Sequence, residues 1–227
     1  MVNMILRKAL KKDIDNIMRT EKSSFIPEIQ ETEELFLKRI EVFNDGFLVF
    51  EDNDDFQHFV GYLSSELWRL STVTTIASAE TGASGIAKVE GMPSADQRID
   101  ATVTTNVELN SKTAPEAVLD DSNFLVGHDI SKRHIPGGDV LYLSSFAILP
   151  EYRGGGRGKK LFEMSLKYFE SNFMLSKMIL LVNPYWTNAR KIYEKNGFVE
   201  TRRIENVFCI NSTEKTYGIV MEKNINC

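Results

Sequence analysis

An apolar strand that runs into a glycine-rich turn and then into a helix is the feature that most restricts how this chain can fold. Residues 141–160 read LYLSSFAILPEYRGGGRGKK. The strand pattern ends at Pro150, and the run from Arg153 to Gly158 opens a helix that the spacing predicts over 156–169. Consecutive glycines let backbone N–H groups approach a ligand where a Cβ atom would block it. The turn therefore predicts a site for a multiply charged anion, such as a pyrophosphate, at the start of this helix.

Other phosphate-binding loops fit this run poorly. Lys160 stands where a P-loop needs Ser or Thr, and Leu161 stands where the dinucleotide-binding pattern needs its third glycine. A glycine turn that binds no ligand remains the alternative for this segment taken alone.

The sequence on both sides alternates between strand and helix patterns. Short apolar runs and alternation predict strands over 4–9, 46–51, 56–67, 140–149, 178–182, 198–208 and 217–223. Helical spacing predicts helices over 12–19, 31–43, 156–169 and 187–196, the last of them ended by Gly197. This order predicts a mixed α/β sheet in one domain that covers residues 1–227.

Residues 69–123 differ in composition from the rest of the chain. They contain no Phe, Tyr or Trp, and they carry four basic and eight acidic residues, a net charge of −4. Such a segment buries little apolar area to offset the entropy of ordering it. We therefore expect a peripheral low-complexity insertion before the 140–149 strand. Two interpretations stay open, a lid over the substrate and a solvated insertion without function.

Composition and charge exclude several classes of protein. The 227 residues are 42% hydrophobic and 26% charged, which is typical of a globular protein and not of a disordered chain or a disulfide scaffold. A net charge of −5 argues against nucleic acid or an anionic membrane as a partner. The N-terminal residues lack a signal-peptide pattern, and Cys209 and Cys227 lack metal-ligand spacing. We expect a cytoplasmic protein without a metal site.

Two motifs resemble those of a known family. The pattern Arg153-x-x-Gly156-x-Gly158 is similar to the pyrophosphate loop of the GCN5-related N-acetyltransferases (GNAT), which bind acetyl-coenzyme A. Residues 183–198, NPYWTNARKIYEKNGF, resemble the second cofactor segment of that family. The resemblance implies the GNAT fold, a mostly antiparallel central sheet flanked by about four helices. Residues 134–138 and 192–195 look closest to the arylalkylamine and polyamine acetyltransferase branch.

The glycine turn and the resemblance together indicate the residues that hold acetyl-CoA. These are Phe146, Ala147, Ile148, Arg153, Gly154, Gly155, Gly156, Arg157, Gly158, Lys159, Asn183, Asn188, Ala189 and Tyr193. By resemblance, backbone N–H groups near Phe146–Ile148 hold the thioester, and Tyr193 is the general acid that protonates the leaving thiolate. The alternative for Tyr193 is a core residue, and Asn188 is an N-cap, a cofactor contact or both.

A base must take a proton from the amine, and the sequence offers several candidates. They are His128 with Asp129, then His134, then Glu33 on the second helix. The animal arylalkylamine enzymes of the resembling branch carry two histidines on the strand before the glycine turn, where this chain has Tyr142 and Ser144. Glu33 and Ser144 are also the residues that we expect to contact the substrate.

These observations predict an N-acetyltransferase that moves the acetyl group of acetyl-CoA to a small primary amine, polyamine-like or arylalkylamine-like. No cysteine lies in either motif, which favours direct attack of the amine in a ternary complex. Two alternatives remain open: an acetyltransferase of protein N-termini or lysines, and a non-catalytic sensor that binds acyl-CoA. The expected partner is the amine itself, and a homodimer is a possible assembly.

Overall fold

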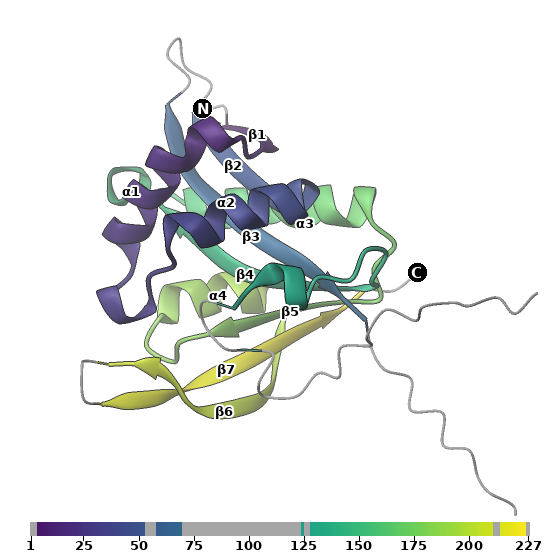
Figure 1. Cartoon of the computed structure of the whole chain (residues 1–227). Helices are drawn as coiled ribbons and strands as arrows, with labels where there is room; N and C mark the ends of the chain where they lie inside the picture. Colours follow the sequence, from purple (N-terminus) through teal and green to yellow (C-terminus); the bar gives the residue numbers. More distant parts are fainter. Residues whose placement is uncertain (1–3, 53–57, 70–123, 125–127, 211–213, 226–227) are drawn as a thin grey trace, which may run out of the picture. The chain divides into compact units, whose positions relative to one another are not determined.

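A computed structural model describes residues 4–52, 58–69, 124, 128–210 and 214–225 (Figure 1). All of them belong to one compact unit made of Met1–Ser71 and Pro115–Cys227. Of the insertion expected over 69–123, the described residues include Arg69 alone. Phe124, directly after the insertion, is also described. The insertion and the single-domain count therefore stay predictions.

The described strands form one sheet of seven. They are β1 (Met4–Lys8), β2 (Phe47–Asp52), β3 (Phe59–Trp68), β4 (Val140–Ile148), β5 (Lys177–Val182), β6 (Val199–Cys209) and β7 (Lys215–Asn224). Their order in the sheet is β1-β2-β3-β4-β5-β7-β6. Neighbours are antiparallel except β4 and β5, which are parallel. The predicted mixed, mostly antiparallel sheet is confirmed.

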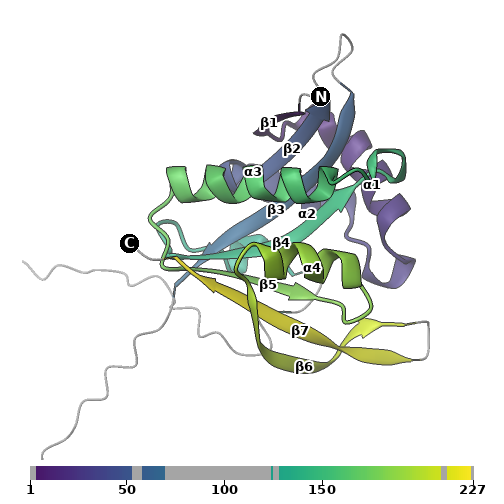
Figure 2. The ribbon, with the colours of Figure 1, turned by 180° about the vertical axis from the view of Figure 1, so that it is seen from behind.

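Four α-helices in the described part of the chain cover the sheet. α1 (Ile14–Ser24) and α2 (Glu33–Val42) lie on one face, and α3 (Arg157–Asn172) and α4 (Thr187–Lys195) lie on the other (Figures 1 and 2). Short 3-10 turns are η1 (Lys11–Asp13), η2 (Pro27–Ile29), η3 (Asn44–Gly46), η5 (Ile130–Lys132) and η6 (Pro150–Tyr152). Among the described residues we find no helix with the length and apolar character that a bilayer span needs.

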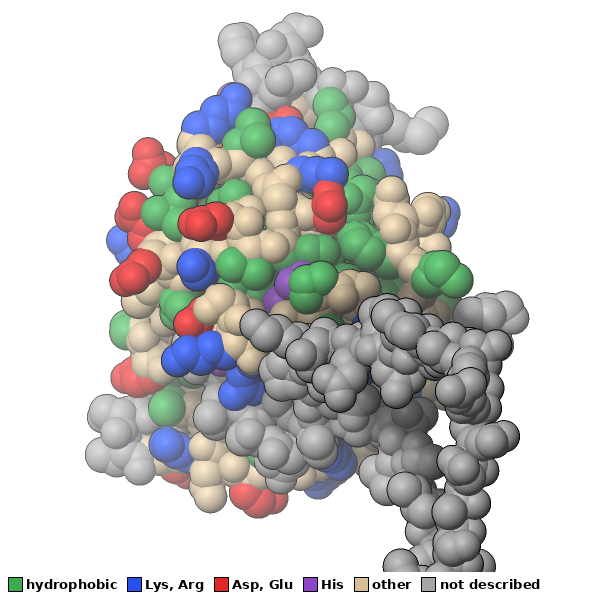
Figure 3. Space-filling model, turned by 45° about the vertical axis from the view of Figure 1, so that its right-hand side comes forward, with side chains coloured by type: hydrophobic (Ala, Val, Ile, Leu, Met, Phe, Trp, Pro, Cys, Tyr) green, Lys and Arg blue, Asp and Glu red, His purple; other side chains and the backbone are tan. Residues whose placement is uncertain are grey.

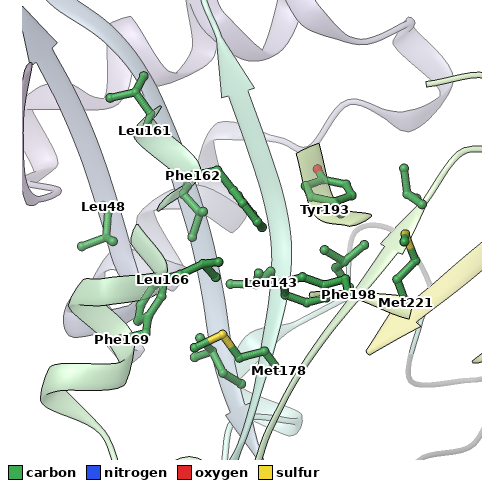
Figure 4. Close-up of a cluster of buried hydrophobic side chains, with 14 of the residues drawn as sticks. Leu48, Leu143, Leu161, Phe162, Leu166, Phe169, Met178, Tyr193, Phe198 and Met221 are labelled. Atoms are coloured by element: carbon green, nitrogen blue, oxygen red, sulfur yellow. The ribbon is translucent and has the colours of Figure 1, made fainter. Parts of the chain in front are cut away.

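Each face of the sheet has its own apolar layer. Under α1 and α2, Ile17, Phe36 and Ile40 pack against Val49 and Tyr62 of the sheet. Under α3 and α4 the layer is larger and includes Leu143, Leu161, Phe162, Leu166, Phe169, Met178, Tyr193 and Phe198 (Figure 4). The buried residues of α3 recur at helical spacing, as the sequence predicts.

α2 begins two residues later than the sequence predicts. Thr32 is its N-cap, and the Thr32 side chain accepts a hydrogen bond from the Leu35 N–H at 3.3 Å. Glu31 lies just before this cap, and its N–H donates a hydrogen bond to Glu21 Oε1 at 2.8 Å. Its carboxylate pairs with Arg39 of α2, so Glu31 joins α1 to α2 instead of starting α2.

The sheet divides where β4 and β5 separate. The two strands pair from Val140–Lys177 to Leu143–Leu180, and beyond these pairs β4 stays with β3 while β5 stays with β7. Figure 2 shows the two strands diverging towards their carboxyl ends. The register between β3 and β4 also shifts at this point, because Ser64 faces Ser145 and Ser65 faces Leu143. Ser144 is therefore an extra residue in β4, and such a bulge bends the strand.

Gly61 of β3 provides a test of how closely β3 and β4 pack beside this division. A Cβ atom at Gly61 would lie 2.3 Å from the carbonyl oxygen of Ala147, whereas a Cβ atom at Gly158 would have its nearest neighbour at 3.4 Å. Gly61→Ala should therefore force the strands apart and lower the unfolding free energy by about 1–3 kcal/mol. Gly158→Ala, in the first turn of α3, should leave it unchanged or raise it. Thermal denaturation of both variants measures the difference, and equal melting temperatures would contradict the close approach.

Candidate active site

The glycine turn has the backbone that the sequence predicts. After β4, Gly154, Gly155 and Gly156 all have positive φ, at 87°, 58° and 78°, and Gly156 is the N-cap of α3. Residues with a side chain rarely adopt this conformation, which explains the three glycines in a row. The Arg157 N–H donates to the Gly154 carbonyl at 3.1 Å, and the turn leaves the next N–H groups of the first turn of α3, those of Gly158 and Lys159, available to an anion.

Two arginines flank this turn in different ways. Arg153 holds the turn in place, because its Nε donates to the Ile148 carbonyl and its Nη2 donates to Ser24 Oγ, both at 2.8 Å. Arg157 Nε is buried and has no hydrogen-bond partner within the described structure.

A cavity of about 670 Å³ opens where β4 and β5 diverge. Its volume is in the range of small-molecule sites. The glycine turn, residues 144–148 of β4, the first turns of α4 and the end of α1 line it. It brings together the following residues expected at the site: His128, Ser144, Phe146, Ala147, Ile148, Arg153, Gly154, Gly156, Gly158, Lys159, Asn188, Ala189 and Tyr193.

Other expected residues do not line the cavity: Asp129, His134, Glu33, Gly155, Arg157 and Asn183. Asp129 caps η5, where its Oδ1 accepts from the Ser131 N–H at 3.0 Å. His134 stacks on Phe43 at a centroid distance of 4.4 Å, and its Nδ1 accepts from the Leu67 N–H. Glu33 is exposed in the first turn of α2. Their catalytic or substrate-binding roles stay predictions, and for Asp129 and His134 the contacts show a structural role.

The segment expected to contact the cofactor, residues 183–198, lies along the other side of the cavity. Asn183 Oδ1 accepts from the Tyr185 N–H at 3.0 Å and so shapes the turn between β5 and α4. The N-cap of α4 is Trp186, so Asn188 lies inside the first turn of this helix and its N-cap alternative is wrong. Asn188 and Ala189 instead face the cavity.

Tyr193 is both a core residue and a cavity residue. Its ring packs on Phe162 at 4.9 Å and on Phe198 at 6.3 Å. In Figure 4 its hydroxyl oxygen points away from Phe198 and Met221. Burial raises the pKa of the Tyr193 phenol, so the hydroxyl keeps its proton at neutral pH. The two alternatives of the sequence are therefore compatible, since packing holds the ring and the cavity reaches the side chain.

His128 lies on the cavity wall beside a buried carboxyl group. His128 Nε2 is 2.6 Å from Glu66 Oε1, and the same oxygen accepts from Trp68 Nε1 at 2.8 Å. Glu66 Oε2 is buried without a hydrogen-bond partner among the described residues. Tyr142 stacks on Trp68 at 4.3 Å and also lines the cavity.

The end of α1 and the segment before α2 form an acidic part of the wall, in which the sequence patterns did not single out Glu21. Glu21 is 1% exposed; its Oε1 accepts from the Glu31 N–H, and its Oε2 accepts from the Tyr62 hydroxyl. Tyr62 Oη is also 3.0 Å from Ser145 Oγ of β4. Glu31 pairs with the buried Arg39, whose Nη1 donates to Ser144 Oγ at 3.2 Å. A hydrogen-bonded network therefore links α1 and α2 to the bulge of β4.

Burial raises the pKa of the Glu21 carboxyl to about 7, although hydrogen bonds from Tyr62 and from the Glu31 N–H oppose the shift. One signal in the sequence points to this residue. Ile17, Thr20 and Glu21 follow the inward spacing of α1, and all three are buried. A carboxyl group on the buried face of a helix is rare unless it has a partner or a function.

Three aromatic rings complete the cavity wall. Phe25, at the end of α1, lies 5.4 Å from Trp186, and Trp186 lies 5.5 Å from Phe208 of β6. Within the described part of the chain, no group of His, Cys, Asp and Glu side chains is arranged to hold a metal ion.

Comparison with known proteins shows what this chain is similar to. Residues 117–200 match the family model of the acetyltransferase (GNAT) domain. The search of curated proteins gave no match. The family match and the shared fold support the GNAT superfamily for this chain; neither supports the arylalkylamine and polyamine branch.

Solved structures share the fold over nearly the whole chain. The loading GNATL domain of CurA from Lyngbya majuscula has a TM-score of 0.65 at 13% identity and covers 98% of both chains. The ribosomal-protein-S18-alanine N-acetyltransferase from Escherichia coli has a TM-score of 0.58 at 12% identity, covering 99% of this chain and 96% of its own. Arabidopsis thaliana Naa50, in complex with the bisubstrate analogue CoA-Ac-MVNAL, has a TM-score of 0.57 at 16% identity, covering 99% and 100%. The predicted GNAT fold is thereby confirmed.

The raised pKa of Glu21 predicts a pH-dependent effect on stability. The folded pKa of about 7 lies above the ordinary value of 4.5, so between these values the folded protein keeps a proton that the unfolded chain releases. Stability from this group is therefore lost as the pH rises towards 7. Glu21→Gln removes this dependence, and its stability relative to the wild type should rise by about 2 kcal/mol between pH 5 and pH 8. Urea denaturation at both pH values measures it.

Glu41→Gln is the matched control, because Glu41 is exposed on α2. Its stability relative to the wild type should not change with pH. A Glu21→Gln difference that is equal at both pH values would contradict the raised pKa.

Proposed function

We propose that this protein is an N-acetyltransferase that moves the acetyl group of acetyl-CoA to a small primary amine by direct attack in a ternary complex. The observation that supports this most strongly is the cavity, which extends from the glycine turn before α3 to the acidic wall at Glu21 and passes Tyr193. One end suits an anionic acyl donor and the other end suits a cationic acceptor.

The residues present fit coenzyme A as the carrier of the acyl group. The N–H groups after Gly154 would hold its pyrophosphate, and Asn188 and Ala189 would contact the adjoining arm. The bulge at Ser144 interrupts the β3–β4 pairing just before Phe146, Ala147 and Ile148. Backbone N–H groups at this part of β4 would stabilise the negative charge that develops on the acyl oxygen.

Tyr193 would donate its proton to the leaving sulfur. The phenol is protonated at neutral pH because burial raises its pKa. A thiolate formed in the same cavity is desolvated as well, which raises its proton affinity and keeps the two groups matched.

Binding of acetyl-CoA should depend on Gly156. We expect acetyl-CoA at about 100 times its Kd to stabilise the wild type by about 2.7 kcal/mol, because the ligand binds only the folded state. Gly156→Val places a branched side chain at the N-cap of α3, where φ is 78° and an added Cβ atom would meet open space. This variant should lose the shift in melting temperature, because its side chain occupies the space of the pyrophosphate.

Gly137→Val is the control, since Gly137 also has a positive φ, 72°, and open space around it but does not line the cavity. It should lower the melting temperature to a similar extent and keep the acetyl-CoA shift. Equal shifts in the two variants would show that the glycine turn does not hold the ligand.

The experiment that tests the proposed function is release of CoA from acetyl-CoA in the presence of acceptors. We expect turnover with a primary amine such as 2-phenylethylamine or spermidine. Tyr193→Phe should reduce kcat by about 10²–10⁴-fold without weakening acetyl-CoA binding, because it removes a proton donor and keeps the ring. Tyr168→Phe, on α3 outside the cavity lining, is the matched control.

Transfer to peptides but not to amines would favour the alternative of a protein acetyltransferase. Acetyl-CoA binding without transfer to any acceptor would favour the alternative of a sensor.

A further inference from the structure

The buried charges around the cavity do not balance. Glu21, Glu31 and Glu66 are 1%, 8% and 0% exposed, and the buried cation that faces them is Arg39, at 1%. On the face of the molecule in Figure 3, by contrast, acidic and basic side chains are interspersed. Buried carboxyl groups are costly unless a cation compensates them. The end of the cavity at Glu21 and Glu31 therefore suits a positively charged ligand.

Glu21 is the carboxyl group of this set that has no ion pair of its own among the described residues. Arg39 is used by Glu31, through Nη2–Oε1 at 2.7 Å and Nε–Oε2 at 3.1 Å. Glu66 has His128 as its neighbour at 2.6 Å. The hydrogen bonds of Glu21 come from a phenol and a backbone N–H, which are neutral donors.

We propose that Glu21 binds the ammonium group of the acceptor and takes its proton, and that the acceptor is a primary amine with no carboxylate beside the nitrogen. This rests on the proposed function and adds to it the residue that activates the acceptor and the class of acceptor. Glu21 faces the cavity together with Ser145, Phe146 and Tyr193.

The contacts of Glu21 place it next to the reacting part of β4. Its Oε2 accepts from Tyr62 Oη, and Tyr62 Oη is 3.0 Å from Ser145 Oγ, directly after the bulge. The groups that face Glu21 are Tyr62 of β3, Ser145 of β4, Glu31 before α2 and Arg39 of α2. A carboxyl group with a pKa of about 7 is partly ionised at neutral pH, so it takes up and releases a proton readily.

The proton balance of the step is complete with groups already described. The ammonium gives one proton to the Glu21 carboxylate, and the free amine nitrogen then forms a bond to the acyl carbon. The bond from that carbon to sulfur breaks, and Tyr193 protonates the sulfur. The nitrogen loses its second proton through water to Tyr193, and Glu21 releases its proton to solvent. The sum is acetylated amine, free thiol and one proton.

His128 is the rival for this role, because it lies on the cavity wall. Its Nε2 is 2.6 Å from Glu66, which orients the ring by a contact inside the protein. Glu21 forms no ion pair among the described residues, and an aromatic residue that lines the same cavity follows it on α1. Phe25 lies one turn after Glu21, and the Phe25 N–H donates to the Glu21 carbonyl at 3.0 Å.

The rings of Phe25, Trp186 and Phe208 would contact the body of the amine. A carboxylate next to the nitrogen would instead meet Glu21 and Glu31, and like charges in a poorly solvated site repel strongly. 2-Phenylethylamine and phenylalanine differ only in this carboxylate, so they form a matched pair of acceptors. Spermidine and an N-terminal peptide are the other two probes.

The experiment measures kcat/KM for the acceptor from about pH 5 to pH 10. In the wild type, kcat/KM for 2-phenylethylamine should rise to a plateau above about pH 7 and fall again near the pKa of the amine, about 10. Phenylalanine should be at least about 100-fold poorer. Glu21→Gln should lower kcat/KM by about 10²–10⁴-fold near pH 7.5 and replace the plateau by a continuous rise, since only the free amine then reacts. The KM for acetyl-CoA should not change.

Two further variants separate Glu21 from its neighbours. Glu41→Gln, which changes an exposed carboxylate, should keep the wild-type profile. Tyr62→Phe removes a hydrogen bond that stabilises the ionised form of Glu21, so the rise near pH 7 should move to higher pH. This shift also tests the proposal if Glu21→Gln does not fold.

The outcomes distinguish this inference from the proposed function. If the wild type acetylates 2-phenylethylamine and Glu21→Gln keeps the plateau, the role of Glu21 is wrong and the acetyltransferase stands. The same holds if His128→Asn, and not Glu21→Gln, removes the rise near pH 7. Equal use of phenylalanine, or transfer to the peptide alone, overturns the acceptor class. No transfer to any probe overturns the proposed function together with this inference.

Discussion

The parallel pairing of β4 with β5 determines where a ligand can bind in this structure. Parallel strands need a crossover, and here α3 provides it between Ile148 and Lys177. The chain also leaves β5 through a turn into α4 on the same face of the sheet. Since the carboxyl ends of parallel strands lie at one edge, the glycine turn before α3 and the start of α4 meet there. The strands separate after Leu143 and Leu180, and the cavity lies in this division.

The buried carboxyl groups behind β4 lower the stability of the folded state, and a function would explain their presence. Glu21, Glu31 and Glu66 are buried around one guanidinium, and the raised pKa of Glu21 shows that the folded state disfavours its charge. Replacing such groups with neutral ones commonly stabilises a protein and costs activity. Glu21 differs here from Asp13, which is also buried but pairs with Arg7 at 2.7 Å and has a lowered pKa. The Asp13 pair stabilises η1, whereas Glu21 faces a cavity.

The sequence predicts the fold and the donor half of the cavity because both depend on local patterns. The apolar run over 140–149 places β4 within one residue, and three consecutive glycines permit the positive φ angles that the turn adopts. The acidic half depends on contacts between distant segments. Tyr62 contacts both Ser145 and Glu21, and this happens only through the pairing of β3 with β4 and the packing of α1 on them. The sequence analysis chose Glu33 as a candidate base on the second helix, and Glu33 lies in the first turn of α2. The buried face of α1, which includes Glu21, indicates Glu21 instead.

A crystal structure with a bisubstrate analogue, in which 2-phenylethylamine is joined to CoA through an acetyl bridge, tests the central claim most directly. The claim is that one cavity between β4 and β5 holds both the acyl donor and the acceptor. We predict electron density for the pyrophosphate at the N–H groups after Gly154, and the acceptor nitrogen near Glu21 and Ser145. The phenyl ring should contact Phe25 and Trp186. Density for CoA away from the glycine turn, or an acceptor on the far side of β4 from Glu21, would contradict the account.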